Sequence, residues 1–130
     1  MARLVVGAAA VVLLFHGLIH LMGTTVYMKL GKVEGLSYKT TLLGGRWDLG
    51  EGGIRVFGAL WTLPALGFAV AATALWTGWP SWRPLLLGAT VFSLALTALD
   101  WGQAYAGVAV NLVILFAVVL GPRLAAWFGR

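Results

Sequence analysis

Two histidines inside an apolar segment are the residues of this sequence best suited to chemistry. His16 and His20 lie within a run from Leu4 to Met28 that carries no Lys, Arg, Asp or Glu. At a spacing of four residues, both imidazoles stand on one face of a helix, one turn apart. An ionisable side chain at membrane depth is costly, so the pair marks a candidate functional site.

Several roles are open to these histidines. They would form part of a metal site if a carboxylate completed the shell, and Asp48, Glu51 and Asp100 are the available acids. A histidine oriented by Asp100 would suit acid–base chemistry on a lipid or quinone. Axial haem ligation needs a second histidine on another helix, and the chain has only these two. The structural role is a hydrogen bond that holds helices together. The sequence names no cofactor.

The composition is that of an integral membrane protein. Of the 130 residues, 61% are hydrophobic and 10% are charged, whereas charged residues make up about 25% of soluble domains. The net charge of +5 comes from Lys and Arg placed mostly at the ends of apolar runs, where cations reach lipid headgroups. We therefore expect the lipid bilayer as a partner, in a bacterial cytoplasmic membrane, and no nucleic acid. The absence of cysteine excludes disulfides and thiolate metal sites.

Four apolar runs predict an all-α, integral membrane four-helix bundle, because a crossing needs about 20 helical residues. The expected helices, all in one transmembrane domain of residues 1–130, are 4–25, 54–76, 84–100 and 105–121. One long loop, 26–53, joins the first two and is expected to contain a strand-like piece at 37–43.

The second helix has two further features. Pro64 should kink it, since a proline frees the carbonyl four residues earlier, that of Leu60. Ala65, Ala69 and Thr73 form a stripe of small residues that lets another helix approach closely. The partner that this stripe implies is a second copy of the chain, in a homo-oligomer, or another membrane subunit.

An even number of helices puts both ends of the chain on one side of the membrane. The terminal side has four cations (Arg3, Arg83, Arg123, Arg130) and the loop side has five (Lys29, Lys32, Lys39, Arg46, Arg55). The positive-inside rule does not decide between these counts. Because Arg3 precedes the first helix and all four acids lie on the loop side, we expect cytoplasmic termini.

Polar residues of several helices should meet at the loop end of the bundle. Thr90, Ser93, Thr97 and Asp100 follow at steps of three and four residues, which makes one polar stripe on a helix. The predicted pocket consists of His16, His20, Arg55, Thr97, Asp100, Gln103 and Asn111.

The glycine-rich stretch 44–53 is a candidate lid over this pocket. It contains Arg46, Trp47, Asp48 and Glu51. Arg46 is placed to pair with either acid, and Trp47 to anchor at the membrane interface. A nucleotide-binding loop is not indicated, since no Gly-Lys-Ser/Thr sequence is present.

Three stretches carry a resemblance to a known kind of protein: His-Gly-Leu-Ile-His-Leu-Met-Gly in the first helix, Thr-Leu-Leu-Gly-Gly-Arg-Trp-Asp-Leu-Gly in the loop, and Val56–Trp61. They resemble a family of small four-helix membrane proteins of high-GC, actinobacterial-type bacteria. In size and helix layout the chain is also similar to the DoxX-like group, some of which are linked to quinone-associated oxidoreductases. The resemblance implies a four-helix membrane fold and assigns no catalytic residue.

Two functions follow from these observations. The first is a non-enzymatic membrane component, either a subunit of a larger complex or a binder of a small lipophilic molecule. The alternative is a membrane enzyme, a quinone- or lipid-linked oxidoreductase or acid–base catalyst, that uses His16 and His20.

Overall fold

The computed structural model describes residues 2–128, and most of them are helical. The helices are α1 (Ala2–Tyr27), α2 (Gly50–Leu60), α3 (Thr62–Thr77), α4 (Trp82–Leu99) and α5 (Trp101–Phe128). Two short strands, β1 (Thr41–Leu42) and β2 (Trp47–Asp48), pair antiparallel in the connection from α1 to α2. Within residues 2–128, four helical segments are long and apolar enough to cross a membrane, with α2 and α3 together forming one of them. The predicted all-α class with four apolar helices is confirmed at this level.

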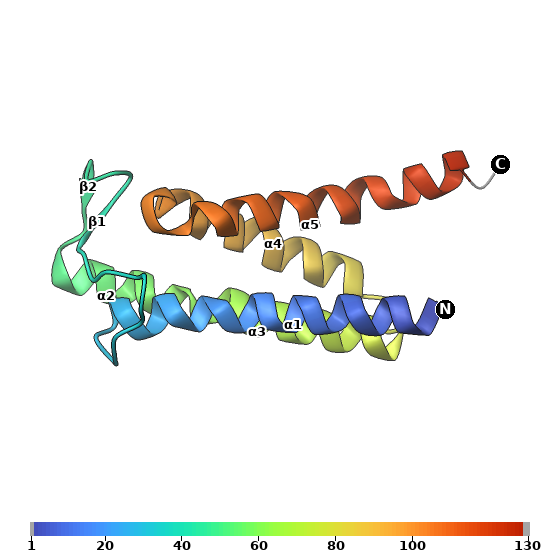
Figure 1. Ribbon diagram of the computed structural model, residues 1–130, viewed down its shortest axis with the longest axis horizontal. Helices are drawn as coiled ribbons and strands as arrows, with labels where there is room; N and C mark the ends of the chain where they lie inside the picture. The colour runs from blue at the N-terminus through green and yellow to red at the C-terminus, as the bar shows by residue number, and fades with distance from the viewer. Residues whose placement is uncertain (1, 129–130) are drawn as a thin grey trace.

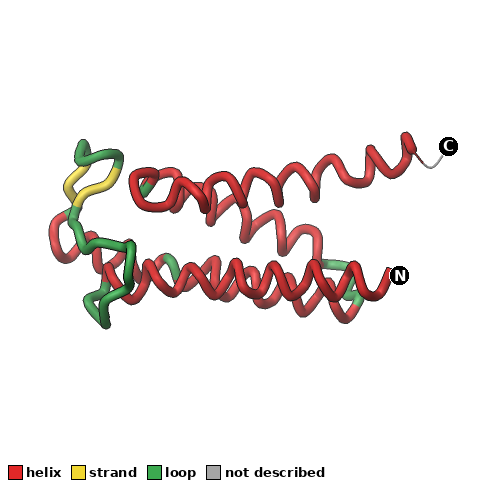
Figure 2. The backbone as a smooth tube through the Cα atoms, in the orientation of Figure 1, coloured by secondary structure: helices red, strands yellow, loops and turns green. Residues whose placement is uncertain are grey.

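The helices pack as an open row. α1 packs on α3, α3 on α4 and α4 on α5, while α2 continues α3 and packs on the end of α1. Figure 1 shows that α1 begins and α5 ends at the same end of the bundle. The hairpin and the junction of α4 with α5 lie at the opposite end (Figure 2). α1 and α5 are thus the outer members of the row, and they face each other across the bundle.

Close helix contact in the row depends on glycine. A Cβ atom at Gly17 of α1 would lie 2.8 Å from Phe68 Cβ and 3.1 Å from the Ala65 carbonyl oxygen. The small-residue stripe of α3 therefore meets α1 of the same chain at Ala65, which is buried. Thr73, at the other end of the stripe, is exposed.

The predicted kink of the second span lies three residues before its proline. α2 ends at Leu60, Trp61 interrupts the helix, and α3 begins at Thr62. A proline ring at position 64 displaces the carbonyl of Leu60, so the irregular turn falls just before it. The Trp61 N–H bonds to the Gly58 carbonyl at 3.2 Å, and the Thr62 hydroxyl donates to the Ala59 carbonyl at 2.7 Å. This span also begins at Gly50 rather than at the expected residue 54.

The last helix is longer than the expected 105–121. It begins at Trp101, has one non-helical residue at Ala104, and continues through Pro122 to Phe128. Pro122 frees the carbonyl of Val118, the residue four positions earlier. Arg83 of α4 donates to that oxygen through Nη2 at 2.8 Å. This bond replaces the missing helical one, so α5 need not end at the proline.

Two apolar clusters fill the bundle at different depths. The cluster nearer the chain ends includes Leu13, Phe68 and Leu86. The cluster at the hairpin end includes Tyr27, Ile54, Phe57, Trp61 and Leu96. Large apolar side chains also cover the exterior, including Leu4, Val12, Phe15, Val113 and Phe116. Such a surface suits hydrocarbon rather than water.

The Gly17 contact makes a prediction about stability. Gly17→Ala should destabilise the protein by about 1–3 kcal/mol, because the added methyl overpacks the contact of α1 with α3. Gly88→Ala is the matched control, since a Cβ atom there meets nothing within 4 Å. Thermal unfolding in mild detergent measures both. Equal stability of the two variants would show that α1 does not approach α3 this closely.

Candidate functional site

A buried hydrogen-bond network links α1, α4 and α5 between the two apolar clusters. His16 Nε2 lies 3.0 Å from Asn111 Oδ1. The Asn111 amide nitrogen donates to Ser93 Oγ at 2.7 Å and to Thr97 Oγ1 at 3.3 Å. His20 Nε2 lies 2.6 Å from Ser93 Oγ, and His20 Nδ1 lies 2.8 Å from the His16 carbonyl oxygen. All of these side chains are buried.

The donors and acceptors of this network fit one set of proton positions. A carbonyl oxygen only accepts, so His20 Nδ1 carries a proton, and in the neutral ring Nε2 accepts from the Ser93 hydroxyl. The Thr97 hydroxyl donates to the Ser93 carbonyl at 2.9 Å and therefore accepts from the Asn111 amide. That fixes the amide orientation, so Asn111 Oδ1 accepts from His16 Nε2. As neutral rings, the form that costs least at membrane depth, His20 is bonded through both nitrogens and His16 through Nε2.

Aromatic rings hold the two imidazoles in place. Phe68 of α3 packs against both of them, with centroid distances of 4.8 Å to His16 and 5.7 Å to His20. Trp61 packs against His20 at 5.5 Å. Trp61 lies close to α1 because position 23 is glycine, where a Cβ atom would meet the indole at 2.7 Å. The rings are therefore fixed by packing as well as by hydrogen bonds.

A second polar cluster surrounds Asp100 at the hairpin end. The carboxylate is 1% exposed. It accepts a hydrogen bond from the Tyr27 hydroxyl and pairs with Lys39 Nζ at 2.6 Å. Gln103 donates to the Tyr27 hydroxyl at 2.9 Å. The same side chain joins the backbone of Ser37, accepting from its N–H at 2.6 Å and donating to its carbonyl at 2.9 Å.

These contacts fasten the connection between α1 and α2 to the junction of α4 with α5. We call residues 33–43 the strap. Its far end is held by Leu43, whose N–H donates to the Leu99 carbonyl at 3.0 Å. Leu42 is buried in the apolar cluster at the hairpin end. The strap thus closes the hairpin end of the bundle over α1 and α5.

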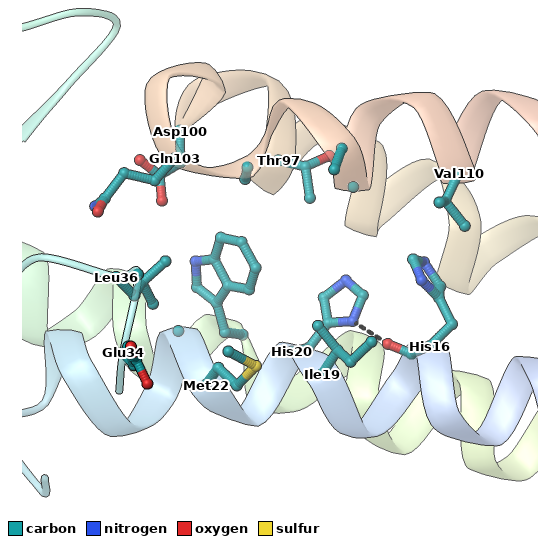
Figure 3. A pocket seen from close by; sticks show the side chains of 16 residues that line it. His16, Ile19, His20, Met22, Glu34, Leu36, Thr97, Asp100, Gln103 and Val110 are labelled. Carbon is teal, nitrogen blue, oxygen red and sulfur yellow. Dashed lines mark hydrogen bonds between the residues drawn. The ribbon is translucent and has the colours of Figure 1, made fainter. Parts of the chain in front are cut away.

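A cavity of about 320 Å³ lies beneath the strap, between α1 and α5. Figure 3 shows His16, Ile19, His20 and Met22 on its α1 side, opposite Thr97, Asp100, Gln103 and Val110. Glu34, Gly35 and Leu36 of the strap form its wall at the hairpin end, and Trp61 also lines it. Ile19, Met22 and Val110 at its rim are exposed. The cavity therefore opens sideways between the two outer helices, where lipid would lie.

The predicted pocket residues are distributed unevenly around this cavity. His16, His20, Thr97, Asp100 and Gln103 line it. Asn111 is fully buried beside it and is the centre of the network. Arg55 is exposed and lies outside it. Arg55 belongs to α2, which packs on α1 and continues into α3.

The predicted lid residues do not line the cavity. Arg46, Trp47, Asp48 and Glu51 belong to the hairpin and the start of α2, and residues 34–36 occupy the covering position instead. The Asp48 carboxylate accepts from the Gly50 N–H at 2.9 Å, which lowers the pKa of Asp48.

Glu51 pairs with Lys29 at 3.0 Å rather than with Arg46. This bond raises the pKa of Lys29.

The acids proposed as a third metal ligand do not join the histidines. Asp100 is held by Tyr27 and Lys39, and Asp48 and Glu51 lie outside the cavity. Within residues 2–128, no cluster of three or more His, Asp or Glu side chains is arranged to hold a metal ion.

Several residues of the site were not predicted from the sequence. Tyr27 lies on the same face of α1 as His20, seven residues further on, and that spacing is the one available indication. Lys39 and Ser37 reach the site only through the path of the strap. Trp61, the residue that interrupts the helix between α2 and α3, also lines the cavity.

The network predicts a large cost for removing its centre. Asn111→Leu leaves the buried His16 N–H without its acceptor and removes the amide donor to Ser93 and Thr97. A buried unpaired group costs about 1–3 kcal/mol. Chemical unfolding in detergent should show this loss. Thr73→Val is the control, because that exposed hydroxyl bonds only to its own helix. Wild-type stability of Asn111→Leu would contradict the network.

The strap predicts a difference between two ion pairs. Asp100→Asn should raise amide hydrogen exchange in residues 33–43, because it removes the charge that holds the partly buried Lys39. Glu51→Gln should leave exchange there unchanged, since the Lys29–Glu51 pair is exposed and such pairs contribute little. Identical exchange in both variants would mean that Asp100 does not hold the strap.

Comparison of the chain with protein-family models, curated proteins and solved structures finds no match. The chemistry of the cavity and its side chains therefore carries the functional assignment by itself.

Proposed function

We propose that this chain is a multi-pass membrane protein that binds a small lipophilic molecule in the cavity between α1 and α5. The observation that carries the proposal is the cavity itself, with its volume of about 320 Å³ and its exposed apolar rim. Ligand sites in proteins have volumes of about 300–1,000 Å³ and apolar walls with a few placed polar groups. An opening toward lipid admits a molecule that is already dissolved in the bilayer.

Binding is favoured over catalysis by the state of His20, because neither nitrogen of its ring is free. Both ring nitrogens of His20 are hydrogen-bonded, to Ser93 and to the His16 carbonyl. His16 Nε2 is bonded to Asn111. A general base must be free to reach the proton that it abstracts. These imidazoles instead support the wall of the cavity and set its shape.

The proposal includes a location and an orientation. We place the chain in a bacterial cytoplasmic membrane with its ends on the cytoplasmic side. In the described part of the chain, Arg3, Arg83 and Arg123 lie at that end and every acid lies at the hairpin end. The numbers of cations at the two ends do not decide the orientation by the positive-inside rule, so the placement rests on Arg3 before the first helix and on the acids at the hairpin end.

Native mass spectrometry of protein released from mild detergent tests binding. The wild type should carry a reproducible adduct, and Val110→Trp should lose it because the larger side chain fills the cavity. Val119→Trp is the matched control, an exposed position of the same helix away from the cavity. A bare wild-type chain, or an adduct that survives in Val110→Trp, would contradict the proposal.

A further inference from the structure

One polar group on the cavity wall has no partner. The indole Nε1 of Trp61 is buried and makes no hydrogen bond within the described residues. The side chain is 6% exposed and lines the cavity. A buried donor without an acceptor is costly, so natural structures supply one from protein, water or ligand. Trp61 therefore brings to the cavity wall a donor that no described group of the protein satisfies.

The charges around the cavity restrict the kind of headgroup. Of the described residues that line it, Glu34 and Asp100 are acids and none is Lys or Arg. Lys39, the nearest cation named above, is already paired with Asp100. An anionic headgroup would meet the Glu34 carboxylate with no lining cation to offset it, which is unfavourable. The wall suits an uncharged group that accepts a hydrogen bond, such as an ester or ketone carbonyl.

A second, apolar cavity continues the first along the bundle. It has a volume of about 340 Å³ and lies between α1 and α5 nearer the chain ends. We call it the crease; its walls include Ala9, Val12 and Leu13 of α1, with Val113, Ile114 and Ala117 of α5. The two cavities share one helix face, since the lining residues of α1 recur at steps of three and four through positions 5, 9, 12, 16, 19 and 23.

The hydrogen bond from His16 to Asn111 lies between the two cavities. Both side chains are buried, so the bond forms a floor over which a hydrocarbon chain can pass. Val12, Ile19, Val110 and Val113 are exposed along this path. The crease thus offers a continuous apolar course for a chain attached to a headgroup at Trp61.

Together these features define the ligand more closely, on the basis of the proposed function. We propose that the ligand is an uncharged lipid with a carbonyl-bearing head and a long hydrocarbon chain. Its carbonyl accepts the Trp61 indole N–H beneath the strap, and its chain lies in the crease between α1 and α5.

Four probes with matched chains test the headgroup: methyl oleate, oleate, oleylamine and 1-octadecene. Saturable binding of tritiated methyl oleate to the full chain in detergent, with the others as competitors, gives relative affinities. Methyl oleate should bind roughly tenfold more tightly than the charged probes, which pay for losing water. A preference for oleate or oleylamine, or equal binding of 1-octadecene, would overturn the headgroup assignment while leaving a lipophile site in place.

Trp61→Phe tests the donor, because it keeps an aromatic ring and removes the N–H. It should weaken methyl oleate binding about fivefold, the worth of one net hydrogen bond. Trp76→Phe is the control, because Trp76 is exposed and lines neither cavity. Unchanged affinity in Trp61→Phe would overturn the role of the indole.

Chain length tests the crease. In the wild type, methyl oleate should bind more tightly than methyl octanoate, and Ala117→Phe should remove that difference by filling the crease. Retention of the difference in Ala117→Phe would overturn the chain's placement. Failure of every probe to bind, together with a bare chain in native mass spectrometry, would overturn the proposed function as well.

Discussion

Hydrocarbon offers no hydrogen-bond partner, so any polar group inside this bundle that the protein leaves unpaired is costly. Asn111 shows the consequence most clearly. Its side chain is fully buried and bonds to His16 of α1 and to Ser93 and Thr97 of α4. Losing any one helix from this arrangement would leave polar groups unpaired in an apolar medium. The network therefore fixes how three helices lie relative to one another.

That constraint explains why a cavity exists in so small a protein. α1 and α5 are the outer members of the row and are held together by polar contacts at two depths. The network joins α1 to α5 at mid-depth through His16 and Asn111. At the hairpin end, the strap that follows α1 is bonded to Asp100 and Gln103 at the junction of α4 with α5. Because α1 and α5 are joined by these bridges but do not pack on each other along their length, space remains between them.

Periodicity made much of the polar interior predictable. His16 and His20 share a face because helix geometry leaves no other choice at that spacing. The stripe of Thr90, Ser93, Thr97 and Asp100 follows from the same rule, and all four side chains are buried. The four apolar spans were equally predictable, since length and hydropathy alone define them.

Contacts between distant segments were not predictable in the same way. Lys39 meets Asp100 because the strap folds back over the bundle, and local sequence carries no sign of that path. The concentration of glycine and charge at 44–53 predicts a lid there, yet residues 34–36 cover the cavity. α5 passes Pro122 because Arg83, on another helix, bonds to the freed carbonyl of Val118. Each outcome depends on tertiary pairing.

The chain's isoleucines provide the most direct test of ligand binding between α1 and α5. Ile19 lines the cavity and Ile114 lines the crease, whereas Ile54 is buried in the apolar cluster at the hairpin end and lines neither. With the Ile methyl groups labelled in deuterated detergent, we expect nuclear Overhauser effects from methyl oleate to Ile19 and Ile114, and none to Ile54. Absence of contacts at Ile19 and Ile114, or equal contacts at Ile54, would contradict a lipid site between these helices.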